Sequence, residues 1–334
     1  MTATGAWTRQ RRVLQGLTAL AGSSLAPHGC GRAIAKPGRW LRLESPNFIV
    51  YSSISQHRSR KEVEALERFH ALLLRLAPRG SRQAAGAAVD IAGGSKDFEQ
   101  IAPAASPGIA GFYSAGLEEI RAVADVTEAN ERQRNIDRNV PAMDARVVLF
   151  HEYAHHCMRA NMRVAYPPWR QEGIAEFLSA VVFTDQGHTP GQFTLNRAPW
   201  LTMGDWMRIE DFLGKDLHTM SGDEKAQYYA QSWLATHLLC TRPDRAVGLD
   251  RYCKALQVGG DPLGCFEGGF GISPAAFNTE LKDYKRKSIA IWKMQDAPLD
   301  ISASIVVSSL DKAANQILMP LAHLRSLLSA QEAS

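Results

Sequence analysis

The sequence lacks an apolar run long enough to cross a bilayer as a stable helix, so we expect no membrane span. It also lacks an excess of charge over most of its length. The formal net charge of +4 is accounted for by residues 1–35, which have no acidic residue and four basic ones: Arg9, Arg11, Arg12 and Arg32. The rest of the 334-residue chain is neutral, which gives no electrostatic reason to expect binding to nucleic acid or to a membrane surface.

Cysteine is scarce as well, with five residues in the whole chain. If residues 1–35 are removed, four remain: Cys157, Cys240, Cys253 and Cys265. An exported protein can pair some of its cysteines. Three pairings are open, and proximity in the sequence favours Cys253 with Cys265. Cys157 is expected to be a buried thiol.

Residues 1–35 have the pattern of an export signal. Arg11-Arg12 precede a modestly apolar stretch, Val13–Ala26. Ala33-Ile34-Ala35 offers a small-x-small cleavage site, with an alternative near Ala26. The twin arginine indicates the twin-arginine route, although Gln15 departs from the usual pattern. We expect an exported protein that is periplasmic or secreted after signal cleavage, with a disordered tail as the alternative.

What the sequence does contain is a pattern typical of zinc enzymes. His151-Glu152-Tyr153-Ala154-His155 reads H-E-x-x-H, within a run that predicts a helix from about Asp144, as N-cap, to about Arg159. The four-residue spacing places both imidazoles on one face of this helix, where they suit Zn²⁺. Glu152 follows the first histidine and is expected to take a proton from a zinc-bound water. The alternative is a solvated helix with incidental histidines.

A catalytic zinc needs a third protein ligand and an open fourth position. Pro167-Pro168 predicts the start of a second helix, from about Trp169 to Val182, and Glu172 in its first turns is the expected ligand. Glu176, one turn later on the same face, is the alternative ligand, but we expect it to orient a ligand imidazole. Gly173 would allow another backbone to approach this helix closely.

The combination of H-E-x-x-H with a following E-G-x-A-E, Glu172 to Glu176, resembles the gluzincin metallopeptidases of clan MA. A closer resemblance is to the bacterial peptidase-MA-like family, once catalogued as a domain of unknown function (DUF1570). It extends over about Trp40–Tyr284 and includes weaker likenesses at Trp40–Tyr51, Tyr229–Trp233 and Gly271–Phe277. The resemblance implies an α+β, zincin-like fold, with a small mixed sheet before the H-E-x-x-H helix and a mainly helical C-terminal lobe.

The same resemblance implies two further features of the site. In gluzincins a sheet edge receives the substrate backbone as an added strand, and Gly111–Ser114 would be that edge here, with an ordinary hairpin as the alternative. In aminopeptidase-like relatives a tyrosine at a helix start stabilises the oxyanion. This makes Tyr229 the candidate and Tyr228 the second choice, with a packed aromatic pair as the alternative. The G-x-M-E-N motif of those relatives is missing, which argues against aminopeptidase activity.

The remaining apolar and turn-forming patterns in the sequence predict how the chain is divided into parts. We expect a leader at 1–35, an α/β part at 36–143, the zinc helices and a helical lobe at 144–290, and a tail at 291–334. The expected smaller elements are strands at Asn47–Ser52, Ala88–Ala92 and Ile301–Val307, a hairpin around Ala115-Gly116, and helices at Arg58–Leu76, Asp311–Leu328 and from Tyr228 onward.

Other histidines and one polar stretch are not assigned to the metal. His70 is expected on a helix face, His188 and His218 at the surface, and His237 in the core. The polar stretch Thr127–Met143 predicts a solvated loop, with a lid as the alternative.

These patterns together with the resemblance imply an exported zinc metallopeptidase acting on a peptide or protein. His151, His155 and Glu172 are expected to bind one Zn²⁺, Glu152 to act as base and then as acid, and Tyr229 to assist the oxyanion. Two alternatives stay open. One is a zinc hydrolase of a non-peptide amide or ester, and the other is a non-catalytic binding module on the same fold.

Overall fold

The computed structural model describes residues 40–77, 87–92, 97, 111–115, 120–125, 145–161, 166–194, 196–287, 289, 291–295, 304–311, 313–314 and 316–318. The predicted leader at 1–35, the loop at 127–143 and the N-cap Asp144 lie outside these residues, as does most of the predicted helix at 311–328. Among the described residues, no helix is both long and apolar enough to span a membrane.

The chain divides into two compact units, which are described one at a time. Unit 1 comprises Met1–Asn130, Asp144–Leu149 and Leu299–Ser334, and unit 2 comprises Glu131–Met143 and Phe150–Pro298. Their described residues form a mixed α+β structure with a small mixed sheet, as the sequence predicted.

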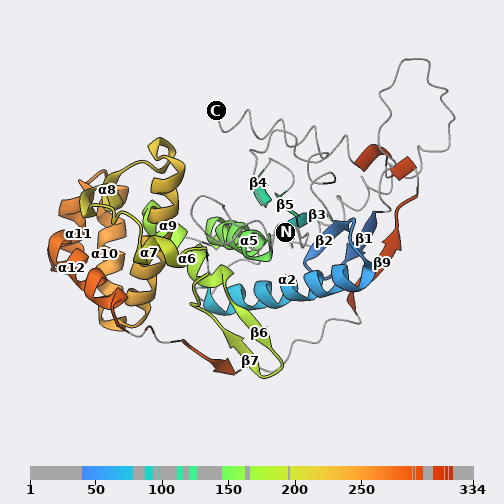
Figure 1. Ribbon diagram of the computed structural model, residues 1–334, viewed down its shortest axis with the longest axis horizontal. Helices are drawn as coiled ribbons and strands as arrows, with labels where there is room; N and C mark the ends of the chain where they lie inside the picture. Colours follow the sequence, from blue (N-terminus) through green and yellow to red (C-terminus); the bar gives the residue numbers. More distant parts are fainter. Residues whose placement is uncertain are drawn as a thin grey trace, which may run out of the picture. The chain divides into compact units, whose positions relative to one another are not determined.

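Unit 1 is built on a mixed six-stranded sheet with the strand order β4-β5-β3-β2-β1-β9 (Figure 1). Its strands are β1 (Leu41–Glu44), β2 (Phe48–Ser52), β3 (Ala87–Ala92), β4 (Gly111–Ala115), β5 (Ile120–Asp125) and β9 (Val306–Ser309). β2, β3 and β5 pair in parallel, whereas β1 pairs antiparallel with both β2 and β9, and β4 pairs antiparallel with β5. The predicted hairpin strands therefore pair, and β4 is an edge of the described sheet.

A long helix, α2 (Gln56–Leu76), connects the parallel strands β2 and β3, as such a crossover requires. Ser55 caps its first turn, and its helical repeat of apolar residues is buried: Val63, Leu66, Phe69, Leu72 and Leu73. α2 contacts β1 and β2, and Figure 1 shows it running alongside these strands. The predicted helix and the strands β2 and β3 are confirmed to within two residues.

The last strand of unit 1 differs from its prediction. The sequence indicated a strand at Ile301–Val307. Residues 301–303 lie outside the described part of the chain, residues 304 and 305 are not in a strand, and β9 runs from Val306 to Ser309 and pairs with β1. Leu310 N also donates to Trp40 O at 3.1 Å, which continues the contact beyond the strand. Backbone pairing with β1, and not the local apolar run, therefore decides where this strand lies, and the expected tail contributes to the sheet.

Unit 2 is mainly helical. Its helices are α5 (Ala145–Asn161, from Phe150 onward), α6 (Pro168–Ser179), α7 (Ala198–Thr202), α8 (Ile209–Gly214), α9 (Gly222–Cys240), α10 (Ala246–Gln257), α11 (Pro262–Phe270) and α12 (Pro274–Lys285), with 3₁₀ turns at Leu217–Thr219 and Pro243–Arg245. A small antiparallel sheet joins β6 (Val182–Thr184), β7 (Gly187–Thr189) and β8 (Met294–Gln295), in that order.

The two helices predicted to carry the site form close to the expected positions. α5 contains the whole H-E-x-x-H motif, and α6 begins at Pro168 with Pro167 as its N-cap. α6 ends at Ser179, three residues before the predicted end. The prediction that a helix opens at Tyr228 is wrong, because α9 begins at Gly222 after a capping box between Ser221 and Glu224.

α6 packs directly against α9 at Gly173. A Cβ atom on this glycine would lie 2.2 Å from Thr236 Oγ1 and 2.3 Å from the carbonyl oxygen of Ser232, both on α9. The predicted close approach of a second backbone is therefore confirmed. Around this contact, the core of unit 2 is filled by fully buried aromatic residues: Trp169, Trp233, Tyr252, Phe266 and Phe277.

Two predictions about minor residues need correction. His188 was expected at the surface, but only 4% of it is exposed, because β7 is the central strand of the small sheet and His188 packs on Phe183. No disulfide joins Cys253 and Cys265: all the described cysteines are free, with Cys253 buried in α10 and the sulfur of Cys265 directed at Gly260.

Three other expectations are met. His237 is fully buried and its Nδ1 lies 2.8 Å from the Tyr284 hydroxyl, whereas His218 is exposed. Cys157 is a buried thiol, and burial raises its pKa to about 12. Such a thiol stays protonated and is unsuited to metal binding or nucleophilic attack at neutral pH.

Candidate metal centre

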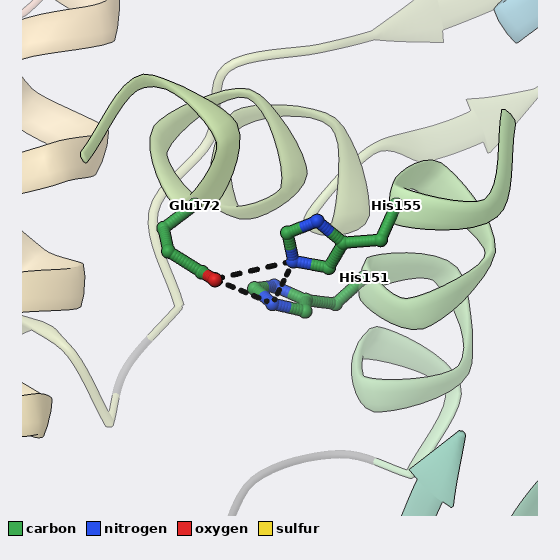
Figure 2. A group of neighbouring side chains, drawn as sticks. All are labelled: His151, His155 and Glu172. Atoms are coloured by element: carbon green, nitrogen blue, oxygen red, sulfur yellow. Dashed lines mark hydrogen bonds and ion pairs between the residues drawn. The ribbon is translucent and has the colours of Figure 1, made fainter. Parts of the chain in front are cut away.

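α5 presents the two histidines of the motif side by side. His151 and His155 are one turn apart, and their ring centroids are separated by 4.7 Å. The opposite side of this turn is anchored in the protein by Phe150, Tyr153 and Ala154, which are buried. Figure 2 shows both imidazoles pointing toward Glu172, which reaches them from α6.

Three ligand-type atoms meet between α5 and α6. His151 Nε2 and His155 Nε2 each lie 3.2 Å from Glu172 Oε2, and the two nitrogens lie 3.1 Å from each other. The side chains are only 11–14% exposed. At most two of these three contacts can be hydrogen bonds, because each ring nitrogen carries at most one proton and an ionised carboxylate none. A cation placed between the atoms would satisfy all three.

The triangle has the dimensions that a zinc site requires. Bonds of 2.0–2.1 Å to nitrogen and oxygen separate neighbouring ligands in a tetrahedral shell by about 3.3 Å. The observed separations of 3.1–3.2 Å are close to this value. Two imidazoles and one carboxylate also suit zinc better than magnesium or calcium, which prefer oxygen ligands. His151, His155 and Glu172 therefore fit a zinc ion.

The charges of the site also suit a metal. Burial acts to raise the pKa of Glu172, but hydrogen bonds from His151 and His155 outweigh it and hold that pKa at about 2. For His151, burial acts to lower the pKa, but the carboxylates of Glu172 and Glu176 outweigh it and raise the pKa. The carboxylate is thus ionised, as a metal ligand must be, and the group as a whole attracts positive charge.

Glu176 lies behind His151, on the far side of the ring from the triangle. Its Oε1 lies 3.5 Å from His151 Nδ1, while Arg197 donates to both carboxylate oxygens, from Nε at 3.1 Å and from Nη2 at 2.6 Å. Burial acts to raise the pKa of Glu176, but the charge and hydrogen bonds of Arg197 lower it. Glu176 therefore lies beside Nδ1 of His151 and is not part of the triangle, and its expected role in orienting the imidazole stays a prediction.

Arg197 is the residue of this site that the sequence did not reveal. It precedes α7, it is almost fully buried, and its guanidinium carbon lies 5.0 Å from the centre of the Tyr229 ring. One signal pointed to such a residue. A glutamate one turn after Glu172 on a buried helix face needs a cation, because an unpaired buried carboxylate is costly. Nothing in the sequence showed which cation.

The two predicted catalytic residues also belong to this part of unit 2. Glu152 lies beside His151 on α5 and is partly exposed, and its negative charge adds a small contribution to the raised pKa of His151. The Tyr229 ring on α9 lies 6.1 Å from the His151 ring, and burial raises the pKa of its hydroxyl, which therefore stays protonated. Tyr228, the second choice, is buried against Phe212 in the core.

Of the predicted site residues, the structure thus brings His151, His155 and Glu172 together, with Tyr229 nearby. Gly111–Ser114, the expected substrate edge, belongs to unit 1 and stays a prediction. No protein-family model matches the sequence, and no curated protein matches it either. The function therefore has to be inferred from the residues and geometry of the site.

Proposed function

We propose that this protein is a zinc-dependent peptidase of the gluzincin type, with a zincin-like fold and one zinc ion per chain, and that it is not an aminopeptidase. The observation that carries the proposal is the triangle of His151 Nε2, His155 Nε2 and Glu172 Oε2, with sides of 3.1–3.2 Å. It joins an H-E-x-x-H helix to a glutamate on the following helix, with the general acid/base candidate Glu152 adjacent to the first histidine.

Each side chain has a task in peptide hydrolysis. His151, His155 and Glu172 would hold a zinc ion, which would supply Lewis-acid chemistry to the scissile carbonyl and make a water molecule easier to deprotonate. Glu152 takes a proton from the attacking water and passes it to the leaving amine. Tyr229, protonated because burial raises its pKa, donates a hydrogen bond to the developing oxyanion.

Glu176 supports this arrangement from behind. A carboxylate next to the second nitrogen of a ligand histidine fixes the ring orientation and keeps the ligating nitrogen available to the metal. The 3.5 Å separation of Glu176 Oε1 from His151 Nδ1 suits this task. Iron enzymes use the same three ligand types, but a carboxylic acid directly after the first histidine is what zinc-dependent hydrolysis needs, and it favours zinc.

The proposal includes export, and its basis is the sequence of residues 1–35. We expect a protein produced with these residues in a bacterial host to be recovered outside the cytoplasm and to begin after Ala35. Amino-terminal sequencing of the recovered protein checks this. An intact amino terminus on cytoplasmic protein would contradict it.

The decisive experiment compares the parent with Glu152→Gln in a peptide-library cleavage assay, with the metal content measured in parallel. We expect the variant to keep its zinc and to lose roughly 10²–10⁴-fold in rate, the usual contribution of a general acid/base. Glu210→Gln is the matched control, since Glu210 is exposed on α8 and pairs with Arg208 there. Equal hydrolysis by the Glu152 variant and the parent would contradict the catalytic assignment.

The same assay separates the two alternatives. Cleavage of small amides or esters but of no peptide would favour a non-peptide zinc hydrolase. Full zinc occupancy with no hydrolysis of any substrate by the parent would favour a binding module. Iron in place of zinc in the purified protein would contradict the choice of metal.

A further inference from the structure

We propose that Arg197 is a positioning residue of this site, whose guanidinium holds the Glu176 carboxylate behind His151 and the ring of Tyr229 at the same time. The inference rests on the proposed function and extends it. It adds to α5, α6 and α9 a fourth segment of unit 2, the turn before α7, on which the geometry of the site depends.

The first half of this task is the contact with Glu176. Arg197 donates from Nε to Oε2 at 3.1 Å and from Nη2 to Oε1 at 2.6 Å, so both carboxylate oxygens are held by the planar fork of the guanidinium. Oε1 is also the oxygen that lies 3.5 Å from His151 Nδ1. The position of the arginine therefore decides where the carboxylate can meet the imidazole.

The second half is the contact with Tyr229. The guanidinium carbon of Arg197 lies 5.0 Å from the centre of the tyrosine ring, within the range of a cation–π contact. The same ring lies 6.1 Å from the ring of His151. Tyr229 thus packs between Arg197 and the proposed zinc ligand His151. A shift of the guanidinium would release both the Tyr229 ring and the Glu176 carboxylate.

Arg197 can act in this way because its own backbone is held in place. Its amide donates to Thr194 O at 2.9 Å, and its carbonyl accepts from Trp200 N at 3.1 Å in the first turn of α7. The residue is only 8% exposed, and its guanidinium is enclosed between α6 and α9 by the contacts with Glu176 and Tyr229. A buried, doubly held guanidinium has little freedom to move.

Arginine is required here for its shape as well as for its charge. A lysine would keep the positive charge beside Glu176 but would lose the two-point fork and the flat face that stacks on Tyr229. Arg197→Lys therefore separates positioning from charge compensation. The matched control is Arg245→Lys, because Arg245 is also largely buried and bonded to a glutamate, Glu280, at 2.6 Å, outside the proposed site.

The experiment measures three properties of the parent, Arg197→Lys and Arg245→Lys. They are the zinc dissociation constant by competition with a chromophoric chelator, the visible spectrum of the cobalt-substituted protein, and kcat and KM for a cleaved peptide. We expect Arg197→Lys to bind zinc roughly 10- to 100-fold more weakly, as loss of an orienting partner does. We also expect it to alter the cobalt spectrum and to lower kcat more than it changes KM. Arg245→Lys should match the parent in all three.

A zinc affinity and cobalt spectrum of Arg197→Lys equal to those of the parent would overturn the inference. If that variant does not fold, Glu176→Gln/Arg197→Met replaces it, since this pair removes both buried charges together. The double variant should show the same weakened zinc affinity and altered spectrum, and parent-like values would again overturn the inference.

If the parent itself binds no zinc, the proposed function fails too. If the parent binds zinc and cleaves peptides while both Arg197 variants behave like it, only this inference fails.

Discussion

His70 in unit 1 and His151 in unit 2 both lie on helices and are largely shielded from water, yet their pKa values move in opposite directions. His70 packs edge-on against Phe48, and burial lowers its pKa, outweighing the opposing effect of Glu67. Burial acts on His151 in the same direction, but Glu172 and Glu176 outweigh it and raise the pKa. Burial alone makes a histidine a neutral core residue, and added carboxylates turn it into a site for positive charge.

Each unit also contains a glutamate–arginine pair, and the two pairs differ in how deeply they are buried. In unit 1, Arg146 donates to both oxygens of Glu62, but the arginine side chain is 44% exposed. In unit 2, the Glu176 and Arg197 side chains are 3% and 10% exposed. When the half-exposed Arg146 loses its carboxylate partner, water can hydrate its guanidinium. Loss of one partner of the Glu176–Arg197 pair instead leaves an uncompensated charge in the protein interior.

The largest effect is expected from breaking the buried pair. Glu176→Leu leaves the Arg197 charge buried without its carboxylate, and we expect it to cost about 3–5 kcal/mol of unfolding free energy in the metal-free protein. Glu176→Leu/Arg197→Met should recover most of this loss, since it removes both charges. Urea denaturation of the metal-free proteins measures both values. A single variant as stable as the parent would show that the pair is not buried in solution.

A smaller but still large effect is expected where α6 packs on α9. Gly173→Ala places a methyl group 2.2 Å from Thr236 Oγ1 and 2.3 Å from Ser232 O, and overpacking of this kind costs about 1–3 kcal/mol. The same denaturation experiment measures it. Gly268→Ala on α11 is the control, because a Cβ there meets no atom within 4 Å. If both variants are equally stable, the close packing of α6 on α9 at Gly173 is wrong.

Breaking the Glu62–Arg146 pair, in which only the arginine is exposed, should cost much less. We expect Glu62→Gln to lower the stability of unit 1 by at most about 1 kcal/mol, because Arg146 stays hydrated when its partner is lost. Hydrogen exchange of peptides from α2 measures the local change. A loss as large as that of Glu176→Leu would remove the distinction between the two pairs.

The smallest effect is a pH dependence in unit 1. The folded-state pKa of His70 is lowered from its ordinary value of 6.5, so the unfolded chain binds the proton more readily. The stability contributed by neutral His70 is thus fully present above the ordinary pKa and declines as the pH falls below it. His70→Gln should flatten the decline between pH 7 and pH 5 in hydrogen exchange of α2, and His57→Gln, at an exposed position on the same helix, should not. An unchanged slope in the His70 variant would contradict the lowered pKa.

Much of the site was predictable because helical spacing converts directly into geometry. The four-residue interval places His151 beside His155, and the same interval separates Glu172 from Glu176 on α6. The proline pair before α6 marked its start, and Gly173 marked the side that another backbone approaches. These are local properties, and local sequence is enough to predict them.

The features that the sequence did not predict depend on partners far along the chain. Arg197 follows Glu176 by 21 residues in the sequence, and two strands of the small sheet, β6 and β7, lie between them along the chain. His188 is buried because β8, far downstream in the sequence, pairs with its strand, β7. Likewise, the position of β9 depends on its pairing with β1, which is far upstream in the sequence. The start of α9 was a different kind of error, since the Ser221–Glu224 capping box is a local signal that the sequence does contain.

The most direct test of the central claim is the zinc content of the purified parent beside His155→Ala, Glu172→Ala and Glu176→Ala, with fold checked by circular dichroism. We predict one zinc ion per chain in the parent, none in the first two variants, and zinc retained with weaker affinity in Glu176→Ala, because only Glu172 belongs to the triangle. A folded Glu172→Ala variant that keeps its zinc while Glu176→Ala loses it would contradict this assignment of the ligands.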